Sequence, residues 1–288
     1  MKTELADLFL LKTELWNLRL EELKARTTKM WTVENLDKVL KGLKNNKTRD
    51  PLGLINEIFK TGVLGDDLKL AILELLNSIK LEQKLPKFMQ LANITTIYKK
   101  KCSRQDMNND RGIFVVCVLR MILDSLIYQE KYPLLDTGMS NSNIGARKNR
   151  NIRDHLFIVY GIINSVLNGE DDPVDIQIYD VEKCFDALWL EDFMLDLYET
   201  LPPEARDDEL SLLYKINQDN YVAVNTVVGQ TERVNMKNIV MQGGKWGPLK
   251  CSNTMDIIGK KCVAPADNIR FRIYKCCKHH KQYSCNIL

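Results

Sequence analysis

The residues with the clearest potential for chemistry lie in the segment Val174–Asp186, VDIQIYDVEKCFD. Its first half alternates apolar and polar residues, the period-2 pattern of a strand with one buried face. We expect Asp180 at the end of this strand, with the aromatic Phe185 and a second carboxylate, Asp186, shortly after it. A carboxylate at a strand tip suits Mg²⁺ (or Mn²⁺) and metal-assisted phosphoryl transfer. The structural alternative is a strand leading into an aspartate-capped helix from residue 187 to 198.

Two basic segments precede this strand. Residues 92–98 predict a strand that runs into Lys99-Lys100-Lys101, and residues 113–116 predict a return strand preceded by Arg111. The pattern indicates a β-ribbon with a basic tip. A second basic loop, residues 145–150, contains Arg147 and precedes a predicted helix.

Charge is distributed unevenly although the formal net charge is only +3. Basic residues predominate from Lys99 to Arg153, and acidic residues predominate from Asp171 to Glu209. One interpretation is a basic surface for a polyanion beside an acidic site that cations neutralise. The other is a pair of ordinary solvated faces.

Helical periodicity accounts for most of the remaining sequence. Leu8, Leu11, Leu15 and Leu18 predict an amphipathic N-terminal helix that packs on its own domain, with a partner as the alternative. Residues 221–228 and 231–234 predict a hairpin around Gly229-Gln230. Further helices are expected around residues 36–43, 66–79, 120–132, 152–166, 210–216 and 249–262.

Composition narrows the class of protein. The chain has 288 residues, 45% of them hydrophobic, which suffices for one large or two smaller cores. Since no apolar run approaches the ~18 residues needed to cross a bilayer, we expect no membrane span. The N-terminus lacks the features of a secretory signal, so we expect an intracellular protein of the cytoplasm or nucleus whose eight cysteines are reduced.

Five segments, in this order, carry a family resemblance: ANITTIYKKK, NNDRGIFVVCVLR, NIGARKNRNIRDHLF, IQIYDVEKCFDALW and VMQGGKWGPLKCSN. They resemble the successive motifs of reverse transcriptases from non-LTR (LINE-like) retrotransposons. The resemblance covers roughly residues 31–262 and implies an α+β fold with the fingers and a partial palm of a right-hand polymerase, the thumb being absent. The implied organisation is an N-terminal helical segment (1–30), fingers (31–170), partial palm (171–262) and divergent tail (263–288).

The resemblance also implies an activity, RNA-directed DNA synthesis with an RNA template, a DNA primer and deoxynucleoside triphosphates. It makes Asp180 the first ligand of catalytic Mg²⁺ (or Mn²⁺), together with the backbone carbonyl of Val181. Asp186 would support the site without binding metal, and Phe185 would exclude the ribose 2′-hydroxyl. The residues implied in nucleotide binding are Lys99 or Lys100, Arg111, Gln242 and Gly243. Arg147 falls in the loop that follows the fingers.

Each of these residues also has an ordinary structural explanation. The lysine run would be a solvated turn, Arg111 would pair with a local acid, and Gln242-Gly243 would be a simple turn. The order of the five segments favours the functional interpretation over these alternatives.

The sequence departs from the family after residue 262, where the expected Asp-Asp hairpin does not occur. We therefore expect the strand ending at Asp180 to lack its usual neighbour and to leave backbone groups unpaired. The tail contains Cys276, Cys277, His279, His280 and Cys285, whose spacing matches neither a zinc finger nor a zinc ribbon. Three hypotheses remain: a truncated polymerase domain, an inactive relic that binds nucleic acid through basic fingers, and a non-enzymatic interaction protein.

Overall fold

The computed structural model describes residues 2–60, 62–100, 109–169, 175–180, 188–237, 244–261, 273–275 and 283–286. Helices and strands are mixed along the chain, which confirms the α+β class. The α-helices are α1 (Lys2–Lys24), α2 (Val33–Lys41), α3 (Asp66–Glu82), α4 (Val118–Gly138), α5 (Ile152–Leu167), α7 (Leu190–Thr200), α8 (Asp208–Gln218) and α9 (Trp246–Lys261). The 3₁₀ turns are η1 (Asn56–Phe59), η2 (Lys87–Gln90) and η4 (Pro203–Ala205). The strands are β1 (Leu91–Tyr98), β2 (Asp110–Val116), β3 (Asp175–Asp180), β4 (Asp219–Thr226), β5 (Gly229–Gln230), β6 (Val234–Lys237), β7 (Ile273–Lys275) and β8 (Tyr283–Asn286).

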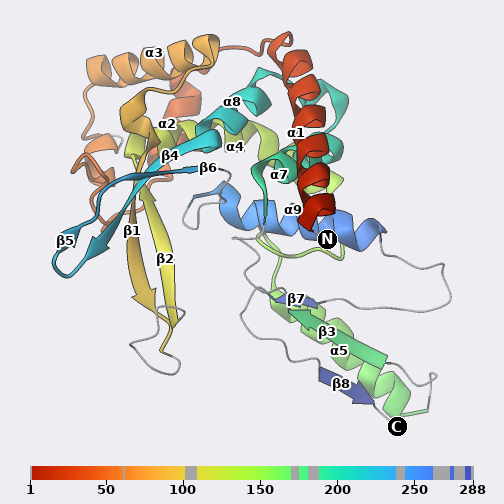
Figure 1. Cartoon of the computed structure of the whole chain (residues 1–288). Coiled ribbons are helices and arrows are strands. Elements are labelled where there is room, and N and C mark those ends of the chain that lie inside the picture. The colour runs from red at the N-terminus through yellow and green to blue at the C-terminus, as the bar shows by residue number, and fades with distance from the viewer. Residues whose placement is uncertain are drawn as a thin grey trace.

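A helical body holds the main core. Buried side chains from α1–α4 and α7–α9 form one continuous apolar cluster (Figure 1). Phe193 of α7 and Trp246 of α9 meet in it, with ring centroids 6.4 Å apart. Burying an aromatic or leucine side chain contributes about 1.5–3 kcal/mol, so this cluster dominates the stability of the fold.

Local signals define where helices begin. Thr32 accepts a hydrogen bond from the Asn35 backbone N–H, and the Asn35 side chain accepts one from the Thr32 backbone N–H. This reciprocal capping box begins α2. Asn151 and Asp154 make the same arrangement at the start of α5.

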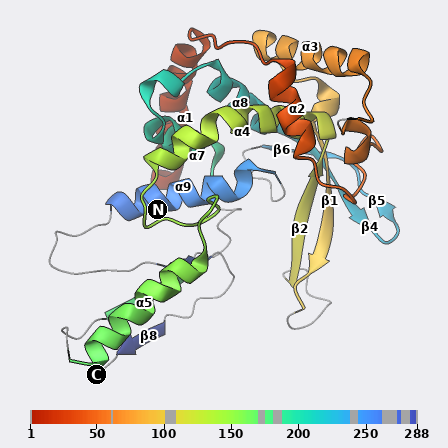
Figure 2. The ribbon, with the colours of Figure 1, turned by 180° about the vertical axis from the view of Figure 1, so that it is seen from behind.

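The first sheet has the strand order β2-β1-β4-β5, with β6 also paired to β4. β1 and β2 are antiparallel, from Ala92 opposite Val116 to Tyr98 opposite Asp110. β1 and β4 are parallel, from Leu91 beside Tyr221 to Thr95 beside Asn225. The β1–β2 ribbon extends away from the helical body in both views (Figures 1 and 2), as the sequence predicts for residues 92–116.

A second sheet corrects the expectation for the strand that ends at Asp180. β3 lies between β7, to which it is parallel, and β8, to which it is antiparallel. Residues of the C-terminal tail therefore lie along both edges of β3: β7 pairs with residues 178–180 and β8 with residues 175–178. The tail supplies strand partners because β pairing joins backbone groups of extended segments in register and does not require a family motif in the side chains.

The N-terminal helix forms as predicted, but the predicted packing face is wrong. Among the side chains of α1 that the structure describes, Trp16 and Leu23 are the buried ones, with 0% and 1% of their surface exposed. The ring centroids of Trp16 and Tyr214 of α8 lie 5.4 Å apart, with the ring planes tilted by 55°. The leucine stripe Leu8, Leu11, Leu15 and Leu18 is instead exposed, because α1 contacts α7 and α8 through the side that carries Trp16.

The hairpin after α8 also differs from its prediction. The turn is Val227-Val228, because Thr226 pairs with Gly229 and its hydroxyl donates to the Gly229 carbonyl at 2.7 Å. Gly229 lies after the turn with φ of 133°, a conformation that other residues rarely adopt. The glycine therefore ends the turn, where the sequence predicted that it formed the centre.

Two buried charge clusters lie within the helical body. In the first, called here the α3–α4–α8 cluster, Lys80 contacts Glu209 at 2.7 Å and Lys131 contacts both Asp207 and Glu209. In the second, the α4–α9 cluster, Arg120 and Asp124 of α4 lie near Lys250 of α9. Arg120 donates one hydrogen bond, to Asn220 at 2.7 Å.

The structure bears on two further expectations, one about membrane-spanning helices and one about the redox state of the cysteines. Among the described residues, no helix is long and apolar enough to cross a membrane. Cys117, at the start of α4, is buried and free. Cys251 of α9 is disulfide-bonded, so the expectation that all cysteines are reduced is wrong at this position.

Candidate nucleic-acid interface

The β1–β2 ribbon places three of the predicted cations at one end. Lys99 and Lys100 directly follow β1, and Arg111 is the second residue of β2, opposite Ile97. The Lys99 backbone N–H donates to the Asn109 carbonyl at 2.8 Å, which continues the pairing one residue beyond the strands. Lys100 and Arg111 are exposed. The antiparallel register thus brings together cations that are separated in the sequence.

The two faces of the ribbon have different chemistry. Ile94, Phe114 and Val116 lie on one face and pack against Ala92 and Val222, forming a small second core. Because side chains alternate along a strand, Arg111 lies on the opposite face. The apolar face anchors the ribbon to the sheet. The opposite face carries Ile97, Ile113 and Val115 beside Arg111, and of these four residues Arg111 and Ile97 are exposed.

The exposed face continues onto neighbouring strands as a hydrogen-bonded polar surface. The Asn225 amide donates to the Thr95 hydroxyl at 3.4 Å, and the Gln230 amide donates to Asn225 at 3.0 Å. Arg233 donates to the Asn93 side chain at 3.2 Å and to the Ala92 carbonyl at 3.1 Å. Amides, hydroxyls and guanidinium groups of this kind donate to phosphate and sugar oxygens.

Sequence analysis missed this polar extension. It depends on the parallel pairing of β1 with β4, which aligns Thr95 with Asn225 across a large separation in sequence. The nearest signal in the sequence is the alternation of residues 219–226, which predicts a strand but names no neighbour. No sequence motif indicates a role for Arg233.

Asp180 lies on a different sheet from the ribbon cations. It is the last residue of β3, and its neighbour in register on β7 is Lys275. The second sheet lies apart from the first in both views (Figures 1 and 2). Within the described residues, the structure therefore does not bring Asp180 beside Lys99, Lys100 and Arg111. The other predicted site residues, Val181, Phe185, Asp186, Gln242 and Gly243, lie outside the described residues.

Arg147 has a structural role in the loop after α4. Its side chain is buried, and its guanidinium contacts the Asp136 carboxylate at 2.7 Å. It also donates to the carbonyls of Asp136, Ser140 and Asn143 at 2.6–2.8 Å. This guanidinium lowers the pKa of Asp136. With its donors directed at the protein, Arg147 fixes the loop and is not presented to a phosphate.

Two basic loops meet over a pair of tyrosines. Tyr128 and Tyr132 of α4 stack with centroids 4.9 Å apart. Lys148, from the loop before α5, lies 4.8 Å from the Tyr132 ring, and Lys245, from the loop before α9, lies 5.8 Å from the Tyr128 ring. Burial raises the pKa of Tyr128 to about 12. Burial, and secondarily Lys148, lowers the pKa of Lys245.

The described residues do not form a site that fits two divalent cations. They contain no group of three or more His, Cys, Asp or Glu side chains able to hold a metal ion. No protein-family model and no curated protein matches this chain.

Proposed function

We propose that this chain is the fingers and partial palm of an RNA-directed DNA polymerase, and that by itself it binds a primer–template through the β1–β2 ribbon. The observation that carries the proposal is the position of Lys99, Lys100 and Arg111 at the exposed end of one ribbon. The order of the five sequence segments supports the same ancestry.

Electrostatics favours binding to a phosphate backbone. The ribbon presents its cations on a structure that extends from the body, and the polar face of Asn225, Gln230 and Arg233 continues beside it. Cations of this kind bind nucleic acid without reading its sequence, and each phosphate contact releases condensed counterions. The proposal therefore implies affinity that falls steeply as salt rises.

Catalysis by this chain alone is not part of the proposal. In the resembling enzymes Mg²⁺ stabilises the attacking and leaving oxygens during nucleotidyl transfer. Here the sequence carries Asp180, but the Asp-Asp hairpin that would supply the further carboxylates does not follow residue 262. Asp180 would hold a single ion weakly, and the ribbon would position nucleic acid without extending it.

The test is fluorescence anisotropy of a labelled RNA–DNA primer–template, titrated from about 50 to about 200 mM salt. Replacing Lys99, Lys100 and Arg111 together by glutamine should weaken binding at least tenfold at the lowest salt. It should also reduce the salt slope by about 2–3. A matched control replaces Lys29, Lys38 and Lys84, which are exposed on the helical body, by glutamine.

Three outcomes contradict the proposal. Equal losses in both triple variants would show that only net charge matters, and affinity that ignores salt would remove the electrostatic basis. The same samples, supplied with Mg²⁺ and deoxynucleoside triphosphates, should show no primer extension. Extension that disappears in Asp180→Asn would show that this chain completes the catalytic site.

A further inference from the structure

The leucine stripe of α1 is an exposed apolar surface along one side of a helix. Leu8, Leu11, Leu15 and Leu18 have 45%, 61%, 43% and 71% of their surface exposed. Their spacing alternates three and four residues, which places all four along one side of a helix as the a and d positions of two heptads. Soluble monomers rarely expose contiguous apolar surface of this kind without a binding role.

The fold holds α1 rigidly through a different side. Trp16 and Leu23 are buried against the body, Lys12 forms an ion pair with Asp192 of α7, and the Tyr198 hydroxyl donates to Glu22 at 3.0 Å. These contacts keep α1 helical without help from the stripe. Association through the stripe therefore does not bear the cost of nucleating a helix, which makes isolated short coiled coils marginal.

The charged residues on either side of the stripe indicate which helix could pair with it. With Leu8 and Leu15 at a and Leu11 and Leu18 at d, the e positions are Lys12 and Arg19. The g positions are acidic: Asp7, Glu14 and Glu21. In a parallel pair of helices each g residue faces the e residue five positions further along the partner. Asp7 would face Lys12 and Glu14 would face Arg19, each across the pair, so every such contact joins opposite charges.

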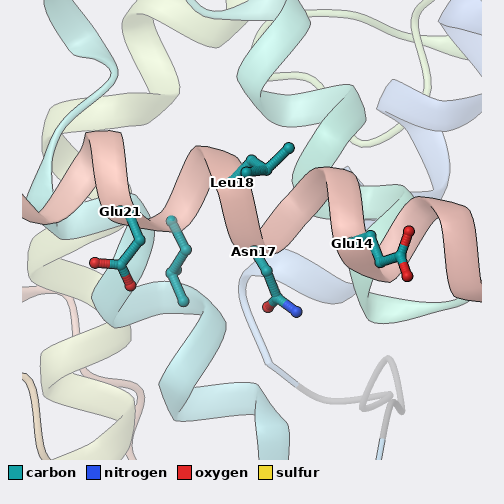
Figure 3. A pocket seen from close by; sticks show the side chains of 5 residues that line it. Glu14, Asn17, Leu18 and Glu21 are labelled. Atoms are coloured by element: carbon teal, nitrogen blue, oxygen red, sulfur yellow. The ribbon is translucent and has the colours of Figure 1, made fainter.

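The same pattern disfavours other arrangements. An antiparallel pair of these helices would place g beside g and e beside e, so that acids would face acids and bases would face bases. A hollow lined by Glu14, Asn17, Leu18, Leu20 and Glu21 borders the stripe, and Figure 3 shows its labelled side chains projecting from successive turns of α1. The acidic g positions are thus accessible at the edge of the apolar surface.

We propose that a second copy of this chain docks on the stripe, forming a parallel two-helix contact between two α1 helices. The contact is independent of the proposed nucleic-acid binding. Two heptads bury less surface than a standard protein interface of about 1,200–2,000 Å², so a dissociation constant in the micromolar range is expected. Within their own chain Lys12 pairs with Asp192, Arg19 contacts Tyr198 and Glu22, and Glu21 pairs with Lys24. The remaining N–H donors of Lys12 and Arg19 can serve the partner's Asp7 and Glu14.

The first experiment is sedimentation equilibrium of the full chain from about 5 to about 200 μM. The average mass should rise with concentration from the 33.3 kDa monomer toward the dimer. Leu11→Asn with Leu18→Asn should weaken association at least tenfold. At concentrations low enough for the chain to be monomeric the thermal midpoint should stay unchanged, because both side chains are exposed in the monomer. Leu10→Asn is the matched control: Leu10 is 58% exposed on the same helix but lies off the stripe, and its replacement should leave association unchanged.

The second experiment tests the parallel register by charge exchange. Glu14→Arg and Arg19→Glu should each weaken association about five- to tenfold, because each single change sets like charges opposite one another at both symmetry-related contacts. The double variant should return to within about threefold of the original. A monomer at every concentration, a dimer insensitive to Leu11 and Leu18, or a double variant no better than the singles would each overturn the proposal.

Discussion

The two buried charge clusters of the helical body contain similar groups but differ in how those groups are paired. In the α3–α4–α8 cluster, Lys80 donates to Glu209 and to the Lys29 carbonyl at 2.8 Å and lies 4.5 Å from the Trp31 ring. In the α4–α9 cluster, Lys250 lies 4.5 Å from the Phe193 ring, but its ammonium has no hydrogen-bond partner among the described residues. Two of the Arg120 nitrogens and one Asp124 oxygen are equally unpaired there.

The two clusters differ in what a buried charge contributes to the stability of the fold. A desolvated ion is stable only when its partners replace the lost water, so the first cluster joins α3, α4 and α8 through directed contacts. In the second, burial lowers the pKa of Lys250 to about 7 and raises the pKa of Asp124. Burial also raises the pKa of Asp207 in the first cluster, where Glu209 Oε2 has no hydrogen-bond partner but lies 3.4 Å from the Lys131 ammonium. We infer that the first cluster stabilises the fold and that the second is a cost the surrounding apolar core offsets.

Removing Glu209 should break the first cluster and have the largest effect. Glu209→Ala would leave Lys80 and Lys131 buried without this carboxylate, and a stranded buried charge costs about 3–5 kcal/mol. Urea unfolding followed by circular dichroism would measure the loss. Glu204→Ala, an exposed glutamate in η4, is the control and should change stability by less than about 0.5 kcal/mol. A small loss at Glu209 would show that the pairing is not stabilising.

Replacing Lys250 should increase the free energy of unfolding, and the size of the increase should depend on pH. Unfolded lysine keeps its proton to about pH 10.4, whereas the folded side chain loses it near pH 7. Stability of the original chain therefore rises with pH between about 7 and 10, by up to about 1.4 kcal/mol per unit. Lys250→Met lacks this slope, so it should be about 1–3 kcal/mol more stable at pH 6.5, with a gain that shrinks as pH rises.

The measurement is urea unfolding of both chains at pH 6.5, 7.5 and 8.5. Curves that stay parallel across this range would mean that Lys250 keeps an ordinary pKa and that the α4–α9 cluster is as well paired as the other. Lys80→Met is the comparison within the α3–α4–α8 cluster. Since it leaves Glu209 with one fewer cation, it should destabilise the fold at all three pH values.

Sequence analysis predicted local structure better than it predicted neighbours. The ribbon at residues 92–116 and the helices were found because periodicity and turn residues act over short distances. The pairing of β1 with β4, and of β3 with β7 and β8, could not be found this way, since a strand pattern does not name its partner. Arg147 shows the same limit: the sequence places it in a basic loop, and only the folded loop shows that it donates to carbonyls.

Breaking the exposed pair Lys24–Glu21 should change the stability of the fold least. It gives the reference value against which the effects of the two buried clusters are compared. The two groups lie 2.6 Å apart, closer than any contact of Lys250, yet their side chains are 37% and 74% exposed. Water screens such a pair and holding two long side chains costs entropy, so Lys24→Ala should change stability by less than about 0.5 kcal/mol. Urea unfolding at low and high salt would measure it. An effect approaching that of Glu209→Ala would mean that proximity, and not burial with directed partners, decides what a charge pair contributes in this fold.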